Sequence, residues 1–271
     1  MAVGVGILTL ALAEGALRAT AGLRNGRHVR YDARLGWAPR AGYVGPADGS
    51  YVTITPDGWR SNGLSSPVLA VGDSFTFGAD VLDSETWPAQ LERLIGRSVV
   101  NAGVSGYGLD QAVLRAEELI PRVQPSLLVV AFIPDDVERC GLRERVDAKP
   151  WLSASGIVHH APRRLELLRL TSRLRGWRPV PSGEDAGAVA RLLAGRVGRL
   201  GVPWMALALG HPGAWDASAE PFLEGAREAG ARVLDLRQEL RAAPRLFTRT
   251  VHPTPRGHAV IAARVAEALG A

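Results

Sequence analysis

Residues 68–74 read Val-Leu-Ala-Val-Gly-Asp-Ser, and this stretch decides the fold. Four consecutive apolar residues predict a strand buried on both faces, because a strand with one face in solvent alternates apolar and polar residues. Four further strands are expected at 98–101, 127–133, 204–209 and 232–236, with helical segments between them. Strands that alternate with helices form a parallel sheet covered on both sides. The sequence therefore predicts an α/β fold, a three-layer α/β/α sandwich with a parallel sheet.

The chain divides into three parts. Residues 65–271 hold the alternating strands and helices, interrupted by an expected insert at about 138–183. Residues 31–64 are rich in glycine, proline and aromatic residues and predict a small β-rich lead-in. Residues 1–30 are a possible membrane-proximal or truncated anchor helix. The helices expected in the sandwich are 84–95, with Ser84 as candidate N-cap, 109–123, 185–200, 219–229 and 254–269.

Composition excludes several classes of function. The chain has 271 residues, of which 46% are hydrophobic, which is enough for one sizeable core. Its net charge of +5 comes almost wholly from arginine, because Lys149 is the only lysine. No zinc-ligand spacing, Walker loop or basic stripe with interleaved aromatics is present, so we expect no nucleic-acid partner, no metal and no other cofactor. The single cysteine, Cys140, excludes an intramolecular disulfide.

The N-terminus suggests a membrane nearby. Residues 2–13 are apolar and small, but the run is shorter than the ~20 residues of a membrane span and lacks the basic start of a signal peptide. We expect it to be part of an anchor helix, which favours a membrane-associated or cell-envelope location, with a cytoplasmic one as the alternative. A short surface helix is the simpler interpretation of the same residues.

Ser74 and His252 are the candidate catalytic pair. A serine hydroxyl is a weak nucleophile until a base takes its proton, and histidine has a pKa suited to that task. Ser74 follows the first buried strand directly, and His252 precedes the last expected helix. Because a parallel sheet gathers the carboxyl ends of its strands along one edge, residues far apart in the sequence can meet there. This layout indicates a serine hydrolase.

The motifs resemble the ordered blocks of the SGNH (GDSL) hydrolase family over about residues 65–271. Segments of the lead-in, Leu35-Gly36-Trp37 and Asp57-Gly58-Trp59-Arg60, are similar to those of membrane-anchored bacterial members. The resemblance implies an SGNH hydrolase-like sandwich with flavodoxin-like topology. The segments that carry it are Gly72-Asp73-Ser74, Asn101-Ala102-Gly103-Val104-Ser105-Gly106, Pro134-Asp135-Asp136 and His252-Pro253.

The same resemblance implies roles for individual residues. Ser74 is then the nucleophile and His252 the base, while the backbone N–H groups of Ser74 and Gly106 donate to the oxyanion. Asp73 and His211 are candidates for substrate contacts, although Asp73 is more simply explained as a brace for the turn.

Two positions depart from the family pattern. Asp135 stands where the family has an oxyanion-stabilising asparagine, and an ionised carboxylate only accepts hydrogen bonds. We therefore expect Asp135 to be protonated or to point away. Arg249 stands where the family has the acid that orients the histidine, which leaves a Ser–His dyad helped by a backbone carbonyl. A further hypothesis is that Arg249, also a candidate substrate contact, pairs with Asp135, or that Asp135 reaches His252.

The function expected from these residues is ester hydrolysis through an acyl-enzyme. The substrate is expected to be a small-molecule ester or an ester of a glycan or lipid, such as an O-acetylated glycan. One alternative is an O-acyltransferase that uses the same dyad and a sugar or natural-product hydroxyl as acceptor. The other is a non-catalytic SGNH scaffold that binds a ligand. The sequence gives no indication of oligomeric state.

Overall fold

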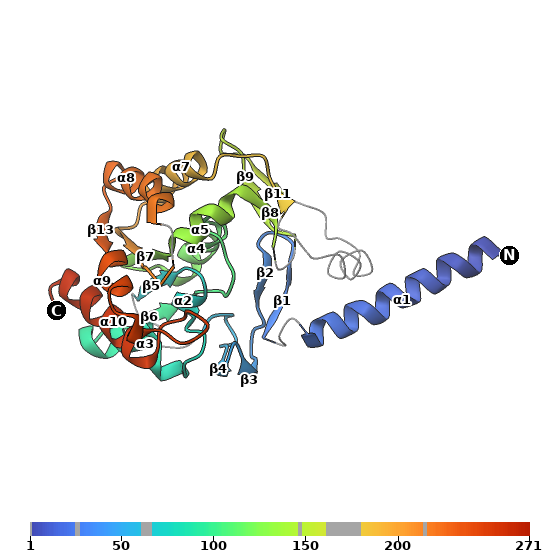
Figure 1. The fold of residues 1–271 in the computed structure, drawn as a ribbon, viewed down its shortest axis with the longest axis horizontal. Coiled ribbons are helices and arrows are strands. Elements are labelled where there is room, and N and C mark those ends of the chain that lie inside the picture. The colour runs from blue at the N-terminus through green and yellow to red at the C-terminus, as the bar shows by residue number, and fades with distance from the viewer. Residues whose placement is uncertain (1, 25–27, 61–66, 146–147, 161–179, 214–215) are drawn as a thin grey trace.

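The centre of the molecule is a five-stranded parallel sheet with the strand order β13-β12-β7-β5-β6 (Figure 1). The computed structural model describes residues 2–24, 28–60, 67–145, 148–160, 180–213 and 216–271. In chain order the sheet reads 2-1-3-4-5, which is the flavodoxin-like order and confirms the predicted topology. The strands are β5 (Val68–Val71), β6 (Val99–Asn101), β7 (Leu127–Phe132), β12 (Trp204–Ala208) and β13 (Arg232–Asp235).

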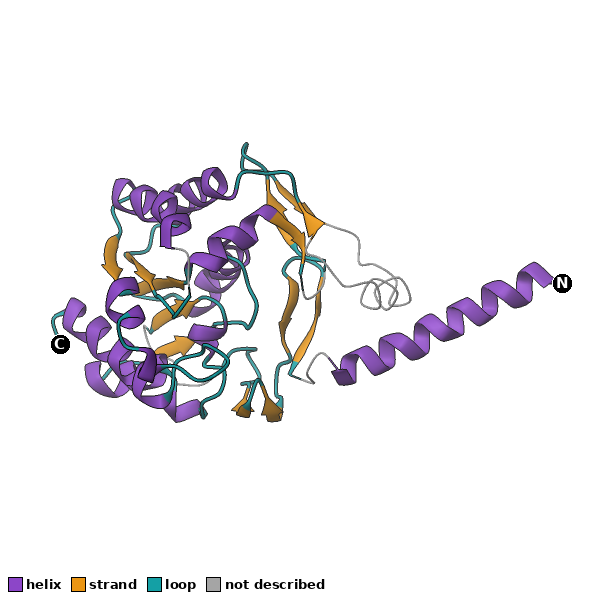
Figure 2. Ribbon diagram, in the orientation of Figure 1, coloured by secondary structure: helices purple, strands orange, loops and turns teal. Residues whose placement is uncertain are grey.

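The strands β5, β6, β7 and β12 are buried on both faces, as their continuous apolar runs predict, whereas the edge strand β13 is partly exposed. In β5, Leu69 and Val71 point into one core and Val68 and Ala70 into the other, and all four are fully buried. Helices cover both sides of the strands (Figure 2). One core holds α4 (Leu109–Val123), α7 (Ala186–Gly198) and α8 (Glu220–Glu228), and the other holds α3 (Trp87–Ile95) and α10 (Pro255–Leu269). The three-layer sandwich is thereby confirmed.

Most expected helices begin and end near the predicted residues, but the first one does not. Residues 83–85 form a 3₁₀ turn, η1 (Asp83–Glu85), and α3 starts only at Trp87. The N-cap is Thr86, whose side chain accepts a hydrogen bond from Ala89 N at 3.3 Å, and not the expected Ser84. The remaining short helices are α2 (Ser74–Phe77), α5 (Pro134–Glu138), α9 (Arg237–Arg241), η2 (Arg139–Gly141), η3 (Asp216–Ala219) and η4 (Pro244–Leu246).

The lead-in, described over residues 28–60, consists of two hairpins packed against the sandwich. Trp37 and Tyr107 share the main core, and their rings meet edge to face. Trp37 Nε1 donates to Ser105 O at 3.1 Å, and the Tyr107 hydroxyl donates to Trp37 O at 2.6 Å. The lead-in is thus fixed to the loop that follows β6. Its strands are β1 (Val29–Asp32), β2 (Gly36–Pro39), β3 (Val44–Ala47) and β4 (Ser50–Thr53).

The insert is anchored by a buried ion pair. Lys149 Nζ donates to Asp110 Oδ2 at 2.5 Å, and both side chains are fully buried against α4. The same ammonium also donates to Leu142 O at 3.0 Å. Four short strands are described in the insert: β8 (Leu142–Glu144), β9 (Pro150–Leu152), β10 (Val158–His160) and β11 (Val180–Pro181). The arginine-rich part, 161–179, lies outside the described residues.

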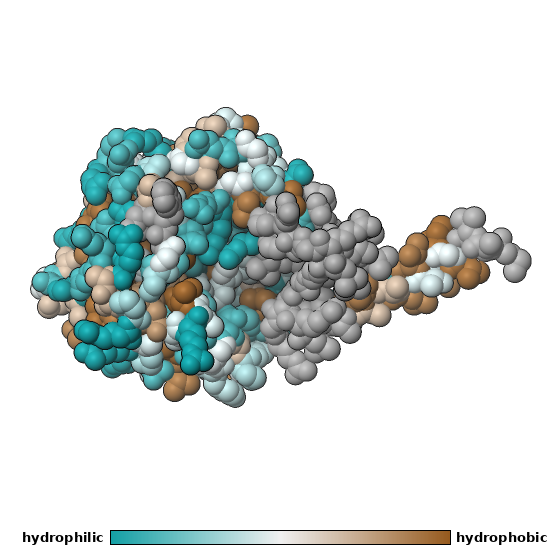
Figure 3. All heavy atoms as spheres, viewed as in Figure 1, coloured by the Kyte–Doolittle hydropathy of each residue, from teal (hydrophilic) through white to brown (hydrophobic). Residues whose placement is uncertain are grey.

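The N-terminal helix α1 (Ala2–Arg24) projects away from the sandwich (Figure 1). Several of its apolar side chains are exposed and give the projecting helix its brown colour in Figure 3, among them Val5, Ile7, Leu8, Leu10 and Leu12. No helix in the described part of the chain combines the length and the apolar character that a membrane crossing needs.

Candidate active site

The turn after β5 presents Ser74 at the carboxyl edge of the sheet. A Cβ on Gly72 would lie 2.5 Å from Ala131 O, so only glycine lets this turn pass so close to β7. Asp73 is buried, and its carboxylate accepts from Phe75 N at 2.9 Å at the start of α2. Asp73 therefore braces the turn. Ser74 becomes the first residue of α2, in the crevice between β5 and β7 where the strand order reverses.

His252 reaches Ser74 from the loop before α10. Its Nε2 lies 3.0 Å from Ser74 Oγ, within hydrogen-bond distance. The loop is held by Thr248 N, which donates to His252 O at 2.8 Å. Between them Val251 adopts a φ of +65°, a strained conformation for a β-branched residue. The structure thus brings together the two residues that the sequence singles out, 178 positions apart.

Asp80 contacts the other nitrogen of His252, and sequence reasoning missed this residue. Asp80 Oδ2 lies 3.2 Å from His252 Nδ1 and also accepts from Thr248 Oγ1 at 3.0 Å and from Thr250 Oγ1. Burial acts to raise the pKa of Asp80, but the hydrogen bonds from Thr250, Thr248 and His252 outweigh it and lower the pKa. An ionised Asp80 can only accept, so Nδ1 of His252 carries the proton and Nε2 is free to accept from Ser74.

A buried arginine of the lead-in holds the loop that carries Asp80. The Arg60 side chain is fully buried, and its Nε donates to Asp83 Oδ1 at 2.6 Å. A buried carbonyl oxygen without a donor lowers the stability of the fold by about 1–3 kcal/mol. The loop is therefore held in the path in which Arg60 can donate to its carbonyl groups. The Nη atoms of Arg60 donate to the carbonyl oxygens of Phe77, Gly78 and Val81 at 2.8, 2.5 and 2.7 Å.

The turn between β3 and β4 reaches into the site from the lead-in. Asp80 N donates to Asp48 O at 2.8 Å. Gly49 packs so closely on Asp80 that a Cβ at this position would lie 2.0 Å from Asp80 Oδ1. The Asp48 carboxylate also accepts from Ser105 Oγ at 2.5 Å, next to the candidate oxyanion residue Gly106. One turn therefore contacts both the residue that faces His252 and the loop that carries Gly106.

Two backbone N–H groups are available at the site. Within the described residues, neither Ser74 N nor Gly106 N donates to a protein acceptor. Gly106 has a φ of +83°, in the left-handed region that glycine adopts without strain. Both residues line the same cavity as His252, so their N–H groups can serve a negative oxygen there.

Asp135 pairs with His211, and this corrects the expectations for that position. Asp135 Oδ2 lies 3.0 Å from His211 Nε2, while His211 Nδ1 lies 3.0 Å from Pro212 O. The hydrogen bond to His211 lowers the pKa of Asp135, and the same bond raises the pKa of His211. Both ring nitrogens of His211 lie within hydrogen-bond distance of an oxygen acceptor, an arrangement that favours the protonated imidazole beside an ionised Asp135. Asp135 is neither protonated nor in contact with His252, whose described partners are Ser74, Thr250 and Asp80.

Arg249 lies outside the cavity. Its side chain is exposed, and among the described residues Asp135 forms its ion pair with His211 and not with Arg249. The hypothesis of an Arg249–Asp135 pair is therefore wrong. His258 is fully buried in α10 and accepts a hydrogen bond from Trp87 N at 3.0 Å.

Ser74, His252, Asp80, Gly106 and Asp135 line one cavity of about 370 Å³. Four non-glycine residues in the described structure have a left-handed backbone. Three of them line this cavity: Asp48, Asp80 and Val251. Strained conformations gather at functional sites because the surrounding contacts hold them there. The lining also includes Phe75, Ser105, Arg139, Arg145 and His211.

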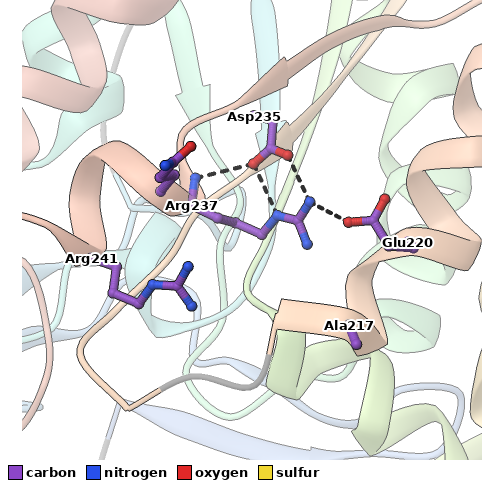
Figure 4. A pocket seen from close by; sticks show the side chains of 6 residues that line it. Ala217, Glu220, Asp235, Arg237 and Arg241 are labelled. Carbon is purple, nitrogen blue, oxygen red and sulfur yellow. Dashed lines mark hydrogen bonds and ion pairs between the residues drawn. The ribbon is translucent and has the colours of Figure 1, made fainter.

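A second cavity, of about 430 Å³, lies at the end of β13. Arg237 crosses it and donates from Nη2 to Glu220 Oε1 at 2.6 Å and to Asp235 Oδ2 at 2.7 Å (Figure 4). Its described lining contains no serine, cysteine or histidine, so it offers no nucleophile–base pair. The cavity around Ser74 is therefore the candidate active site.

Comparisons with known proteins agree with this fold. The sequence profile described as the GDSL-like lipase/acylhydrolase family matches residues 70–260. The chain is similar to Axe2, an acetylxylan esterase from Geobacillus stearothermophilus, at 18% identity and a TM-score of 0.51, over 78% of this chain and 96% of that one. It is also similar to LAE5, an alpha/beta hydrolase from the metagenome of Lake Arreo, at 16% identity and a TM-score of 0.50, over 77% and 97%. A search of the curated proteins gives no match.

Proposed function

Because the chain belongs to the GDSL-like lipase/acylhydrolase family and is therefore a hydrolytic enzyme, we propose that it cleaves carboxylic esters through an acyl-enzyme on Ser74. The observation that carries the proposal is the continuous line of contacts from Ser74 Oγ to His252 Nε2 and from His252 Nδ1 to Asp80 Oδ2, at 3.0 and 3.2 Å. A serine, a base and a group that orients the base form the arrangement that activates a nucleophilic hydroxyl.

In the acylation step, Ser74 Oγ attacks the ester carbonyl carbon, and its proton passes to His252 Nε2. The imidazolium is stabilised by the Asp80 carboxylate, which accepts the Nδ1 proton without taking it. The carbonyl oxygen becomes an oxyanion, and the N–H groups of Ser74 and Gly106 donate to it. A single such donor contributes about 3–4 kcal/mol to transition-state stabilisation. The intermediate then collapses, and His252 returns its proton to the leaving alcohol.

In the second half of the reaction, His252 takes a proton from a water molecule that attacks the acyl-enzyme. A second oxyanion forms at the same two donors. As it collapses, the bond to Ser74 Oγ breaks, the acid is released, and His252 returns its proton to Ser74 Oγ. Asp135 lacks the N–H group of the family's asparagine, so the oxyanion rests on two backbone donors, and His211 neutralises the Asp135 carboxylate beside them.

The substrate is proposed to be an ester of a small molecule, a glycan or a lipid. A cavity of about 370 Å³ is of the size that encloses small ligands. The fold neighbour Axe2 is an acetylxylan esterase, so an O-acetylated sugar is a reasonable first substrate to assay. The non-catalytic alternative rests on the departures from the family pattern at positions 135 and 249. The contact between Asp80 and His252 supports the catalytic proposal against it, because Asp80 can serve as the orienting acid that position 249 lacks.

The test is covalent labelling and turnover by the full chain and by Ser74→Ala. We expect a fluorophosphonate to label the wild-type protein at Ser74, and we expect Ser74→Ala to lower the kcat for 4-nitrophenyl acetate by at least about 10³-fold. Equal rates in the two proteins would contradict the proposal. Adding a sugar acceptor separates hydrolysis from acyl transfer, because a transferase releases the acylated sugar and a hydrolase releases the acid.

A further inference from the structure

The cavity around Ser74 contains an arginine, Arg145, that forms no ion pair with any carboxylate in the described part of the chain. Arg145 lines the cavity beside Gly106, and its Nη1 donates to Gly106 O at 2.6 Å. No Asp or Glu of the described chain forms an ion pair with Arg145, since the carboxylates nearest the site are paired with other cations. Its position therefore adds a positive charge to the wall of the site.

Other arginines in comparable places are neutralised by the protein itself. Arg139, which lines the same cavity, faces the carboxylates of Asp73 and Asp136. Arg237 in the second cavity faces Asp235 and Glu220 (Figure 4). Burying a charge is costly unless an opposite charge accompanies it. Arg145 is thus the exception among these cavity arginines.

Arg145 also keeps hydrogen-bond donors available. A guanidinium carries five N–H groups, and the described contacts of Arg145 use only Nη1. Burial lowers the pKa of Arg145, and the neighbouring Arg139 lowers it further. The negative charges of Asp136, Asp73 and Asp135 oppose this shift only in part, so the pKa stays lowered. An anion beside it would relieve this cost and would accept from the remaining donors.

We propose that Arg145 recognises a negative group on the substrate, so that the natural substrate is an ester bearing a carboxylate or a similar anion. This inference rests on the proposed ester hydrolysis at Ser74. The anion can belong to the acyl half or to the alcohol half of the ester. A guanidinium fork binds a carboxylate with two parallel hydrogen bonds, which gives both affinity and orientation.

The experiment compares charged and neutral esters of matched shape. For the acyl half, mono-4-nitrophenyl adipate is compared with 4-nitrophenyl hexanoate. For the alcohol half, 4-acetoxybenzoate is compared with 4-acetoxybenzamide. The value of kcat/KM is measured for the wild type, Arg145→Gln and Arg145→Lys. Arg143→Gln is the control, because Arg143 is exposed and lies outside the cavity. The substitution removes the same charge two residues away from Arg145.

In one of the two pairs we expect Arg145→Gln to lower kcat/KM for the charged ester about tenfold to a hundredfold more than for the neutral one. We expect Arg145→Lys to restore part of that preference and Arg143→Gln to leave it unchanged. The pair that responds identifies the half of the substrate that carries the anion. If Arg145 only held Gly106 O in place, charged and neutral esters would fall by the same factor in both pairs, and this result would overturn the proposal.

A binding measurement separates this proposal from the proposed reaction. Calorimetry with the non-hydrolysable anions 4-acetamidobenzoate and adipate is carried out on Ser74→Ala and on Ser74→Ala with Arg145→Gln. We expect one anion to bind the single variant and to lose at least about tenfold in affinity in the double variant. This outcome supports the anion site even if no ester is turned over. Equal or absent binding in both variants would overturn it, whatever the result with esters.

Discussion

The parallel sheet and the lead-in contribute to the same site in different ways. The sheet presents Ser74 at the end of β5 through its topology, and β5 is buried on both faces. The lead-in contributes none of the three contacting side chains Ser74, His252 and Asp80. It nevertheless holds Asp80 in place through Arg60 and through the turn at residues 48 and 49. The proposed nucleophile therefore depends on the fold of the family, whereas the proposed orienting acid depends in part on contacts from outside the family's matched region, 70–260.

Replacing Asp80 tests the part of the site that the lead-in holds. In Asp80→Asn the amide can donate to His252 Nδ1, which would reverse the tautomer and leave Nε2 unable to accept from Ser74. We expect kcat for 4-nitrophenyl acetate to fall by about 10²- to 10⁴-fold, with folding intact by circular dichroism. Asp57→Asn is the control, since Asp57 is an exposed carboxylate of the lead-in that pairs with Arg122 at 3.7 Å. A loss of less than about threefold would show that His252 needs no acid.

Replacing Gly49 tests whether the lead-in positions Asp80 or only packs beside it. The Cβ of Gly49→Ala would lie 2.0 Å from Asp80 Oδ1, so the carboxylate must move away from His252. We expect kcat to fall about tenfold to a hundredfold, because a displacement of about 1 Å can have an effect of that size. KM for 4-nitrophenyl acetate should change little, because the cavity keeps its lining.

The matched control for that variant is Gly42→Ala. Gly42 has a φ of +72°, close to the +77° of Gly49, but a Cβ there meets no atom within 4 Å. Both variants therefore carry the same backbone cost of roughly 1–2 kcal/mol, and only Gly49→Ala adds the clash with Asp80. Equal kcat values in the two variants would show that the lead-in packs beside Asp80 without positioning it.

The fold and half of the site could be predicted from the sequence. Continuous apolar runs identify buried parallel strands, and parallel strands bring their carboxyl ends to one edge, which is why Ser74 and His252 could be paired. Asp80 could not be predicted in the same way, because it lies 172 positions before His252 and no local pattern of the sequence links the two residues. Its place depends on a left-handed φ of +67°, on contacts with Asp48 and Gly49, and on the bonds of Arg60 to the neighbouring carbonyl groups of the same loop.

The pairing of Asp135 with His211 could be predicted only in part from the sequence. Asp135 follows β7 and His211 follows β12, and these strands are neighbours in the sheet. The sequence predicts that each residue lies at a strand exit. The strand order that places the two exits side by side comes from long-range pairing, which local patterns do not give. From the sequence alone, Asp135 is therefore only the loss of the family's asparagine, whereas in the structure its carboxylate forms an ion pair with His211.

The contact between α10 and α3 in the sandwich should make the stability of the protein depend on pH, independently of the lead-in. His258 of α10 is fully buried and accepts from Trp87 N at the start of α3, at 3.0 Å. Burial lowers the pKa of His258 to about 3, so the folded protein keeps this ring neutral in mild acid. The unfolded chain protonates it near the ordinary pKa of about 6.5. The unfolded state therefore binds more protons between these values, and stability falls as the pH drops through this window.

The variant His258→Asn should remove this sensitivity and keep the contact, because the asparagine Oδ1 can replace Nδ1 as acceptor for Trp87 N. Between pH 7 and pH 5 we expect the wild type to lose about 2 kcal/mol more in its free energy of unfolding than the variant, as measured by urea denaturation. The effect should persist in Gly49→Ala, since His258 contacts α3 and not the lead-in. The same pH dependence with and without His258 would mean that the ring is protonated in the folded protein, and the joint between α3 and α10 would then have to open in acid.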